Sequence, residues 1–177
     1  MSTDSVNIVV SLATLIVVAA ASVAAIVQLR HLRTSNQLNA MLEILNQWNS
    51  PALQSALAEI QRIPEKLKDP AYVQTLSTPE VIDRAHYPEF LAMDFWEQIG
   101  TFVKRDLVDE STLLDITSGQ IYFAWQICEP AIAITRAKVG LSGFENFEYL
   151  AVRASLWRQR YPDGTYPARV PRMSELS

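Results

Sequence analysis

Residues 6–29 read VNIVVSLATLIVVAAASVAAIVQL, and no side chain in this run is charged. A helix of that length rises about 1.5 Å per residue, which is enough to cross the roughly 30 Å hydrocarbon core of a bilayer. The run therefore predicts a single transmembrane helix. The rest of the chain then has to be explained as something held at the surface of a membrane.

The residues that flank this run predict its orientation. Asp4 precedes it without any lysine or arginine, whereas Arg30, His31 and Arg33 follow it directly. Basic residues next to a span stay on the cytoplasmic side. We therefore expect an inner-membrane protein with its N-terminus outside, its C-terminal part in the cytoplasm, and these three basic residues at the membrane interface.

A cleaved signal peptide is the alternative to an anchor, because the small residues of AAASVAA could form a cleavage site. A signal peptide, however, carries its basic residues before the apolar run, and its apolar run is about half as long. The sequence therefore favours an anchor that stays in place.

Four alanines within the run are placed for close helix packing. Ala20 and Ala24, like Ala21 and Ala25, have the spacing that allows two membrane helices to approach each other. These residues are a candidate dimer face, which predicts a homo-oligomer. The alternative is that alanine is simply common in membrane spans.

The composition of the remaining chain favours helices. Of 177 residues only five are glycine, and the part after the span is rich in Leu, Ala, Ile, Glu and Gln. The single cysteine, Cys128, excludes an internal disulfide and any metal site with several cysteines. Its apolar surroundings predict a buried thiol.

Charge is distributed unevenly along the chain. Residues 34–152 contain 16 acidic against 8 basic residues, a net charge of −8, whereas residues 153–177 contain five arginines against two acids, a net charge of +3. An acidic domain argues against nucleic acid as a partner. The basic tail can fold onto that domain or lie on anionic lipid, so both remain open.

Prolines and capping residues divide the chain after the span into predicted helices. These are a continuation of the span to about Trp48, a helix from Pro51 that ends before Pro64, short helices around Tyr72–Leu76 and Glu80–His86, one from Pro88 to about Leu107, one from Ser111 to Lys138, and one from Phe144 to Arg160. The continuation carries an apolar stripe, Leu38, Met41, Leu42, Leu45 and Trp48, which either packs on its own domain or forms a short dimeric seam.

Four local details belong to the later helices. We expect an interruption near Ser118-Gly119, a bend at Pro130, a left-handed cap at Gly140, and a capping box from Ser142 to Glu145. The expected fold is therefore all-α, with a transmembrane helix that continues into a helical bundle. Its parts are an external tail 1–5, the span 6–29, a stalk helix 30–48, a cytoplasmic helical domain 49–160 and a disordered basic tail 161–177.

A family resemblance emerges from three features: the arginine-flanked span, Glu129-Pro130 within a late helix, and the string FENFEYLA from Phe144 to Ala151. With these the chain resembles the small bacterial membrane proteins grouped as domain of unknown function 4760. The resemblance implies a membrane anchor and a helical domain, and it brings no activity and no catalytic residue.

The best candidate for chemistry is the acidic group His86, Glu89, Asp94 and Glu97. A metal site in a helical bundle uses inward-facing carboxylates with Glu-x-x-His pairs, whereas here the order is reversed and Pro88 separates the pair. We therefore interpret the group as a solvated acidic face. Neither a Cys–His pair nor a phosphate loop is indicated, so no catalytic residue, metal or cofactor is expected.

Two sets of residues are candidates for structural or partner contacts. Glu129 has apolar neighbours in sequence, so we expect a buried carboxylate held by Arg136 or Arg153. The aromatic residues of FENFEYLA, Phe144, Phe147 and Tyr149, either fill the core or present a surface to another protein.

The sequence therefore indicates a membrane-anchored interaction or sensing module rather than an enzyme. Its expected partners are the lipid bilayer, a second copy of the chain, and a membrane or cytoplasmic protein. The alternatives are an enzyme with an unrecognised helical site and an accessory subunit of a transporter or a phage-exclusion system.

Overall fold

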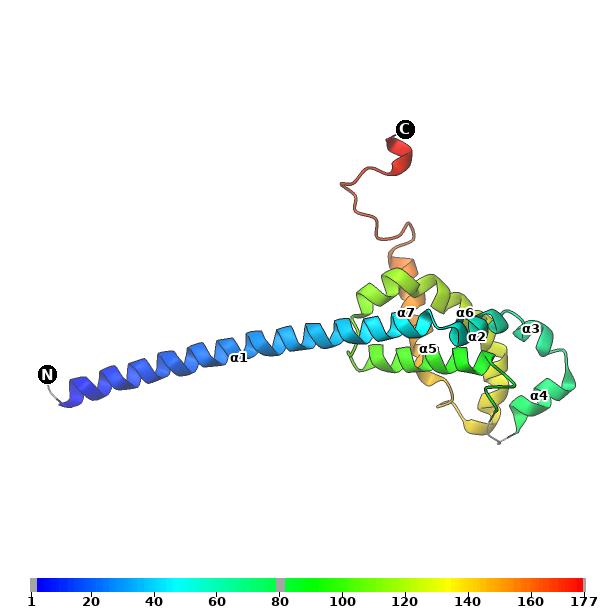
Figure 1. Cartoon of the computed structure of the whole chain (residues 1–177), viewed down its shortest axis with the longest axis horizontal. Coiled ribbons are helices and arrows are strands. Elements are labelled where there is room, and N and C mark those ends of the chain that lie inside the picture. Colours follow the sequence, from blue (N-terminus) through cyan, green and yellow to red (C-terminus); the bar gives the residue numbers. More distant parts are fainter. Residues whose placement is uncertain (1–2, 79–81, 177) are drawn as a thin grey trace. The chain divides into compact units, whose positions relative to one another are not determined.

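The structure, a computed structural model, describes residues 3–78 and 82–176 and consists of helices joined by short connections (Figure 1). The elements are α1 Thr3–Trp48, α2 Pro51–Ile60, α3 Ile63–Lys66, α4 Pro70–Ser77, α5 Glu89–Lys104, α6 Glu110–Val139, α7 Glu145–Arg160 and the short 3₁₀ helix η1 Met173–Glu175. No strand occurs among the described residues, which confirms an all-helical fold. The chain divides into two units, Met1–Asn39 and Ala40–Ser177.

The first unit is formed by α1 alone. Every side chain from Val10 to Asn36 is exposed, and by length and composition this helix can cross a membrane. The helix already begins at Thr3, so it includes part of the expected external tail, while residues 1–2 lie outside the described part. The predicted continuation of the helix to Trp48 is confirmed.

In the second unit, proline and capping residues start the helices at predicted places. The Ser50 hydroxyl accepts a hydrogen bond from the Leu53 amide at 3.3 Å, and the Asp69 carboxylate accepts one from Ala71 at 2.9 Å. The helix from Pro51 ends before Pro64, as predicted, at Ile60, and Pro64 lies in the first turn of the next helix, α3, where its missing N–H leaves no hydrogen bond unmade.

The expected helix Glu80–His86 is wrong where it is described. Residues 79–81 lie outside the described part, and of residues 82–87, which are not helical, 84–86 form a turn. The Asp83 carboxylate accepts a hydrogen bond from the Ala85 amide at 2.9 Å, which favours a turn over a helix. Further on, α5 ends at Lys104, before the predicted Leu107, and Asp106 then takes a positive φ of 58°.

The predicted interruption at Ser118-Gly119 is also wrong, because α6 is one helix from Glu110 to Val139. Its ribbon is bent (Figure 1), and both Ser118-Gly119 and Pro130 are residues at which helices bend. Gly140 follows the helix with a positive φ of 82°, as predicted, but its ψ of 179° is not that of a left-handed helix.

Trp96 of α5 is the centre of the core of the second unit. It is fully buried, and its ring lies 5.3 Å from that of Trp48 and 6.3 Å from that of Phe147. Trp48 belongs to the last turn of α1, so the end of α1 and the start of α7 share one aromatic cluster. After α7 the described tail is irregular apart from η1, and its disorder stays a prediction.

Candidate functional site

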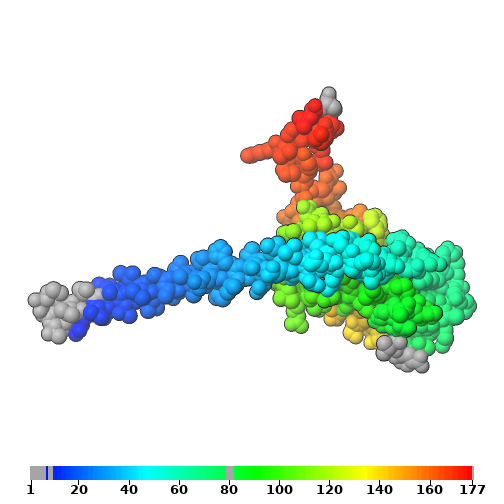
Figure 2. Space-filling model, in the orientation of Figure 1, coloured from blue at the N-terminus to red at the C-terminus, as the bar shows by residue number. Residues whose placement is uncertain are grey.

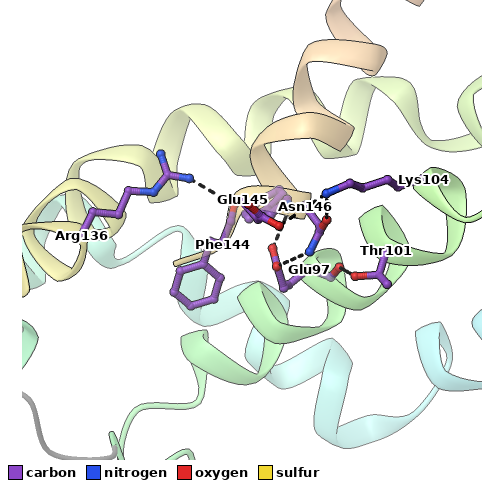
Figure 3. A network of polar contacts seen from close by, with 8 residues as sticks. Glu97, Thr101, Lys104, Arg136, Phe144, Glu145 and Asn146 are labelled. Carbon is purple, nitrogen blue, oxygen red and sulfur yellow. Dashed lines mark hydrogen bonds and ion pairs between the residues drawn. The ribbon is translucent and has the colours of Figure 1, made fainter. Parts of the chain in front are cut away.

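The FENFEYLA string lies where α5, α6 and α7 meet (Figure 3). Phe144 occupies the N-cap position of α7 with a left-handed backbone, φ 56° and ψ 32°. The predicted capping box is therefore wrong, because the residue at the cap has no side-chain oxygen. Ser142 contributes its carbonyl instead, which accepts the Glu145 amide at 3.4 Å.

A side chain of another helix supplies the cap that Phe144 cannot give to α7. Glu97 of α5 accepts the Phe147 amide at Oε2 at 2.8 Å and the Asn146 side-chain amide at Oε1 at 2.7 Å (Figure 3). A carboxylate at a helix N-terminus is also favoured by the helix dipole. Glu97 therefore fixes where α7 begins, from about fifty residues away in the chain.

Gly100, one turn after Glu97, lets α5 and α7 approach closely. A Cβ atom at this position would lie 2.0 Å from the carbonyl oxygen of Asn146. Lys104, a further turn along, donates from Nζ to Asn146 Oδ1 at 3.2 Å and to Glu145 Oε1 at 3.4 Å. Only glycine fits at this contact.

Arg136 joins the same junction from α6 (Figure 3). It donates from Nε to the carbonyl of Gly143 at 2.7 Å and from Nη2 to that of Phe144 at 3.3 Å, and its Nη1 lies 2.7 Å from Glu148. The polar groups of the junction are thus engaged with one another, and this assigns the FENFEYLA string a structural role.

The aromatic residues of the string belong largely to the core. Phe147 is fully buried, with its ring 5.1 Å from that of Trp125 and edge-on to it. Phe144 and Tyr149 are half-buried and pack against the core. Neither Phe144 nor Tyr149 is fully exposed.

The predicted clamp of Glu129 is wrong. Glu129 is exposed, and the two arginines expected to hold it bind other acids. Arg153 holds Glu110 with two hydrogen bonds, from Nε to Oε1 and from Nη2 to Oε2, the second at 2.9 Å, and these bonds raise the pKa of Arg153. Arg136 pairs with Glu148. Apolar neighbours in sequence do not bury a residue that lies on the outer face of its helix.

The acid that is buried is Glu89, at the start of α5, with no exposed surface. Its Oε2 accepts a hydrogen bond from Lys66 Nζ at 2.8 Å, and Lys66 also lies 3.0 Å from Glu59. Burial opposes the charge on Lys66, but the bonds to Glu89 and Glu59 outweigh it and raise its pKa. Hydrogen bonds from Lys66 and then Arg62 lower the pKa of Glu59.

Tyr72 and Cys128 are buried in the same surroundings as Glu89. The Tyr72 hydroxyl and Glu89 Oε1 are buried without a hydrogen-bond partner in the described part of the chain. Burial, and then the Glu89 carboxylate, raises the pKa of Tyr72 above its ordinary value. Burial likewise raises the pKa of Cys128 to about 12. A thiol with that pKa is protonated near neutral pH, so it is a poor nucleophile.

The interpretation of the acidic group as a solvated face is therefore wrong for Glu89 and Glu97. Asp94 pairs with Arg84 at 2.8 Å, and the His86 ring packs on Tyr87. Across residues 3–78 and 82–176 no three His, Cys, Asp or Glu side chains converge on a metal position. Helical phase could have identified Glu89, because it has the spacing of the buried face of α5: Glu89, Met93, Trp96, Gly100 and Val103.

The end of α1 has one buried and one exposed apolar face. Met41 and Ile44 are 9% and 4% exposed, whereas Leu42 and Leu45 are 50% and 38% exposed. A groove of about 300 Å³ lies between the last residues of α1, the start of α2 and α5, and it is lined by Gln47, Ser50, Ala52, Leu53, Leu91, Asp94, Phe95 and Gln98. Figure 2 shows this face, with the cyan end of α1 beside green α5.

In the first unit the predicted site residues are all exposed along α1. They are the candidate dimer face Ala20, Ala21, Ala24 and Ala25, and the candidate interface residues Arg30, His31 and Arg33.

A family model described as "Domain of unknown function (DUF4760)" matches residues 15–154 of the chain, from within the apolar run to the middle of α7. No curated protein and no solved structure matches it.

Proposed function

Because the chain belongs to the family Domain of unknown function (DUF4760), whose description assigns no activity, we propose a function from its own geometry. The protein is a single-pass inner-membrane protein whose cytoplasmic helical domain works by binding proteins, first a second copy of itself, and not by catalysis. The observation that carries this proposal is α1, which passes from exposed apolar side chains to core side chains within one helix.

The exposed part of α1 has the chemistry of a lipid-facing helix. Its apolar side chains from Val10 onward are exposed, and the hydroxyl groups of Thr14 and Ser22 bond to the helix itself. The Thr14 hydroxyl donates to the Val10 carbonyl at 2.9 Å, and the Ser22 hydroxyl donates to the Val18 carbonyl at 2.8 Å. Satisfying polar groups within the helix is what a hydrocarbon environment requires.

The other end of α1 belongs to the core of the second unit. Trp48 packs its ring 5.9 Å from that of Phe95 and 5.3 Å from that of Trp96. No proline or glycine interrupts the helix between Leu29 and Trp48. A rotation or shift of the span would therefore act directly on core residues, which is how such a module would sense events in the membrane.

The proposed contact between copies is the stripe Leu38, Leu42 and Leu45. These residues are spaced by four and three positions, so they share one face of α1, and all three are exposed. Every copy enters the membrane in the same orientation, so the same stripe meets itself in a parallel, two-fold contact. Confinement to the membrane raises the effective concentration of one copy for another.

Disulfide crosslinking in native membranes tests the contact between copies. Leu42→Cys and Leu45→Cys should each give a crosslinked dimer on oxidation, whereas Glu43→Cys, which is exposed on another face of α1, should not. Native Cys128 is buried and adds no background. Equal crosslinking at all three positions, or none at any, would contradict a dimer along this stripe.

The orientation is tested by reporters fused after residue 177. A fluorescent protein that folds only in the cytoplasm should be bright, and alkaline phosphatase, which folds only in the periplasm, should be inactive. The opposite pattern would overturn the proposed topology.

A further inference from the structure

A second pocket, of about 370 Å³, lies between α6, the end of α7 and the start of the tail. Its lining consists of neutral polar side chains, a proline and one cation: Tyr122, Ser155, Arg158, Gln159, Tyr161 and Pro162. All of them belong to the second unit. No acidic side chain lines the pocket, although residues 34–152 carry a net charge of −8.

Arg158 is the cation of this pocket, and no acidic side chain among the described residues forms an ion pair with it. Its guanidinium lies 4.7 Å from the ring centre of Tyr122 and 4.9 Å from that of Phe123. Its Nη1 is buried without a hydrogen-bond partner in the described residues. Arg136 and Arg153, by contrast, each bind a glutamate. Arg158 therefore keeps donor hydrogens on Nη1 that no acceptor among the described residues uses.

Two hydroxyl groups in the pocket also have a hydrogen left to donate. The Tyr122 hydroxyl accepts a hydrogen bond from Gln126 at 3.0 Å, and the Ser155 hydroxyl accepts one from Gln159 at 3.3 Å. A hydroxyl that accepts one bond still carries its own donor hydrogen. The pocket thus combines a guanidinium with two hydroxyl donors and no lining carboxylate.

We propose that this pocket binds a phosphate group, carried by a soluble phosphate ester or by an anionic lipid headgroup. Phosphate oxygens accept several hydrogen bonds at once, and a planar guanidinium binds two of them side by side. The pocket also lies where the chain turns basic, since residues 153–177 carry a net charge of +3. An anion is therefore attracted here and repelled by the acidic part of the domain.

The test uses the full chain in nanodiscs of phosphatidylcholine, titrated calorimetrically with inorganic phosphate, and in nanodiscs that also contain phosphatidylglycerol, monitored by ³¹P NMR. Arg158→Gln should weaken binding at least tenfold. Arg169→Gln, an equal loss of charge at an exposed tail position outside the pocket, should change it less than twofold. Tyr122→Phe keeps the ring under the guanidinium and should weaken binding about threefold to tenfold.

Binding of inorganic phosphate identifies a soluble ligand, and a lipid signal that only phosphatidylglycerol produces identifies the headgroup. Both results support the site if Arg158→Gln removes them. Absence of binding in both arms overturns the proposal. Equal losses in Arg158→Gln and Arg169→Gln also overturn it, because they indicate only general attraction to positive charge. If Arg158→Gln fails to fold, Tyr122→Phe decides: unchanged binding overturns the proposal.

Discussion

Residues 10–29 of α1 and the core of the second unit both consist mostly of apolar side chains, but in opposite surroundings. In α1 all of these side chains are exposed, whereas in the core Trp96, Phe147 and their neighbours are fully buried. The difference follows from the spacing of apolar residues along the sequence. An uninterrupted apolar run gives a helix with no polar side, whereas apolar residues at helical spacing give each helix an inner and an outer face.

The two regions also differ in how they satisfy polar groups. In the first unit the Thr14 and Ser22 hydroxyls bond to carbonyls four residues earlier in the same helix. In the second, Glu97 caps a helix that begins about fifty residues later, and the Lys66–Glu89 pair joins α3 to α5. The two bonds named in the first unit therefore stay within one helix, whereas the second unit depends on contacts between distant segments.

The largest expected effect is on the stability of the domain, which should depend on its core side chains and not on those of residues 10–29. Trp96→Ala empties the centre of the aromatic cluster and should lower the free energy of unfolding of the domain by about 3–5 kcal/mol. Val17→Ala removes apolar atoms that touch no core and should leave it unchanged. Urea unfolding of the purified full chain, followed by tryptophan fluorescence, measures both. Equal losses in the two variants would mean that the span contributes to the domain core.

A charge in the span should impair membrane insertion and leave the stability of the domain unchanged. Val17→Asp should disfavour membrane insertion by about 2.5–3.5 kcal/mol, as expected for a charge at the centre of a membrane helix, while the domain remains folded. The measurement is the fraction of protein that stays with membranes after alkaline extraction. Ser35→Asp, beyond the basic flank, is the matched control and should extract like the wild type.

Two glycines within helices test the close approach of α5 and α7: Gly100 lies at the contact, and Gly119 in α6 is the control. Gly100→Ala places a Cβ against the Asn146 backbone and should cost about 1–3 kcal/mol or more. Gly119→Ala has no atom within 4 Å of its Cβ and should stabilise α6 by about 0.5–1 kcal/mol. Thermal unfolding gives both signs. A stabilised Gly100→Ala would mean that the two helices do not approach so closely.

The last expected effect is a pH dependence that arises from buried groups of the core. The folded domain holds the pKa of Cys128 at about 12, against 9.0 for a free thiol, and also raises that of Tyr72. Stability is therefore complete below pH 9 and declines as pH rises from there, because the unfolded chain releases protons that the folded chain retains. Each group contributes about 1.4 kcal/mol per pH unit.

Unfolding free energies from pH 8 to pH 11 test this dependence. Cys128→Ala should decline less steeply than the wild type, most clearly between pH 9 and pH 10, because the contribution of the thiol is then removed. Parallel curves for the two proteins would contradict a buried, protonated thiol.

Local signals were enough to predict much of the fold. Ser50-Pro51 and Asp69-Pro70 mark helix starts through bonds within three residues, and the apolar run marks α1 by length. The cap of α7 could not be predicted, because it depends on a carboxylate in α5. Glu129 was misjudged from its sequence neighbours, whereas helical phase places Glu89 inside. The Arg158 pocket needs the rings of α6 and the end of α7 together, so no stretch of sequence contains it.

A nitroxide scan of α1 in lipid vesicles tests the central claim most directly. Single cysteines introduced from Val10 to Trp48 carry the label, while Cys128 is buried and does not react. The account predicts that labels at residues 10–29 collide with oxygen dissolved in lipid, that labels from about Arg30 collide with a water-soluble nickel reagent, and that labels at Met41, Ile44 and Trp48 are protected from both. Access of the nickel reagent to residues 10–29 would contradict a membrane-spanning α1.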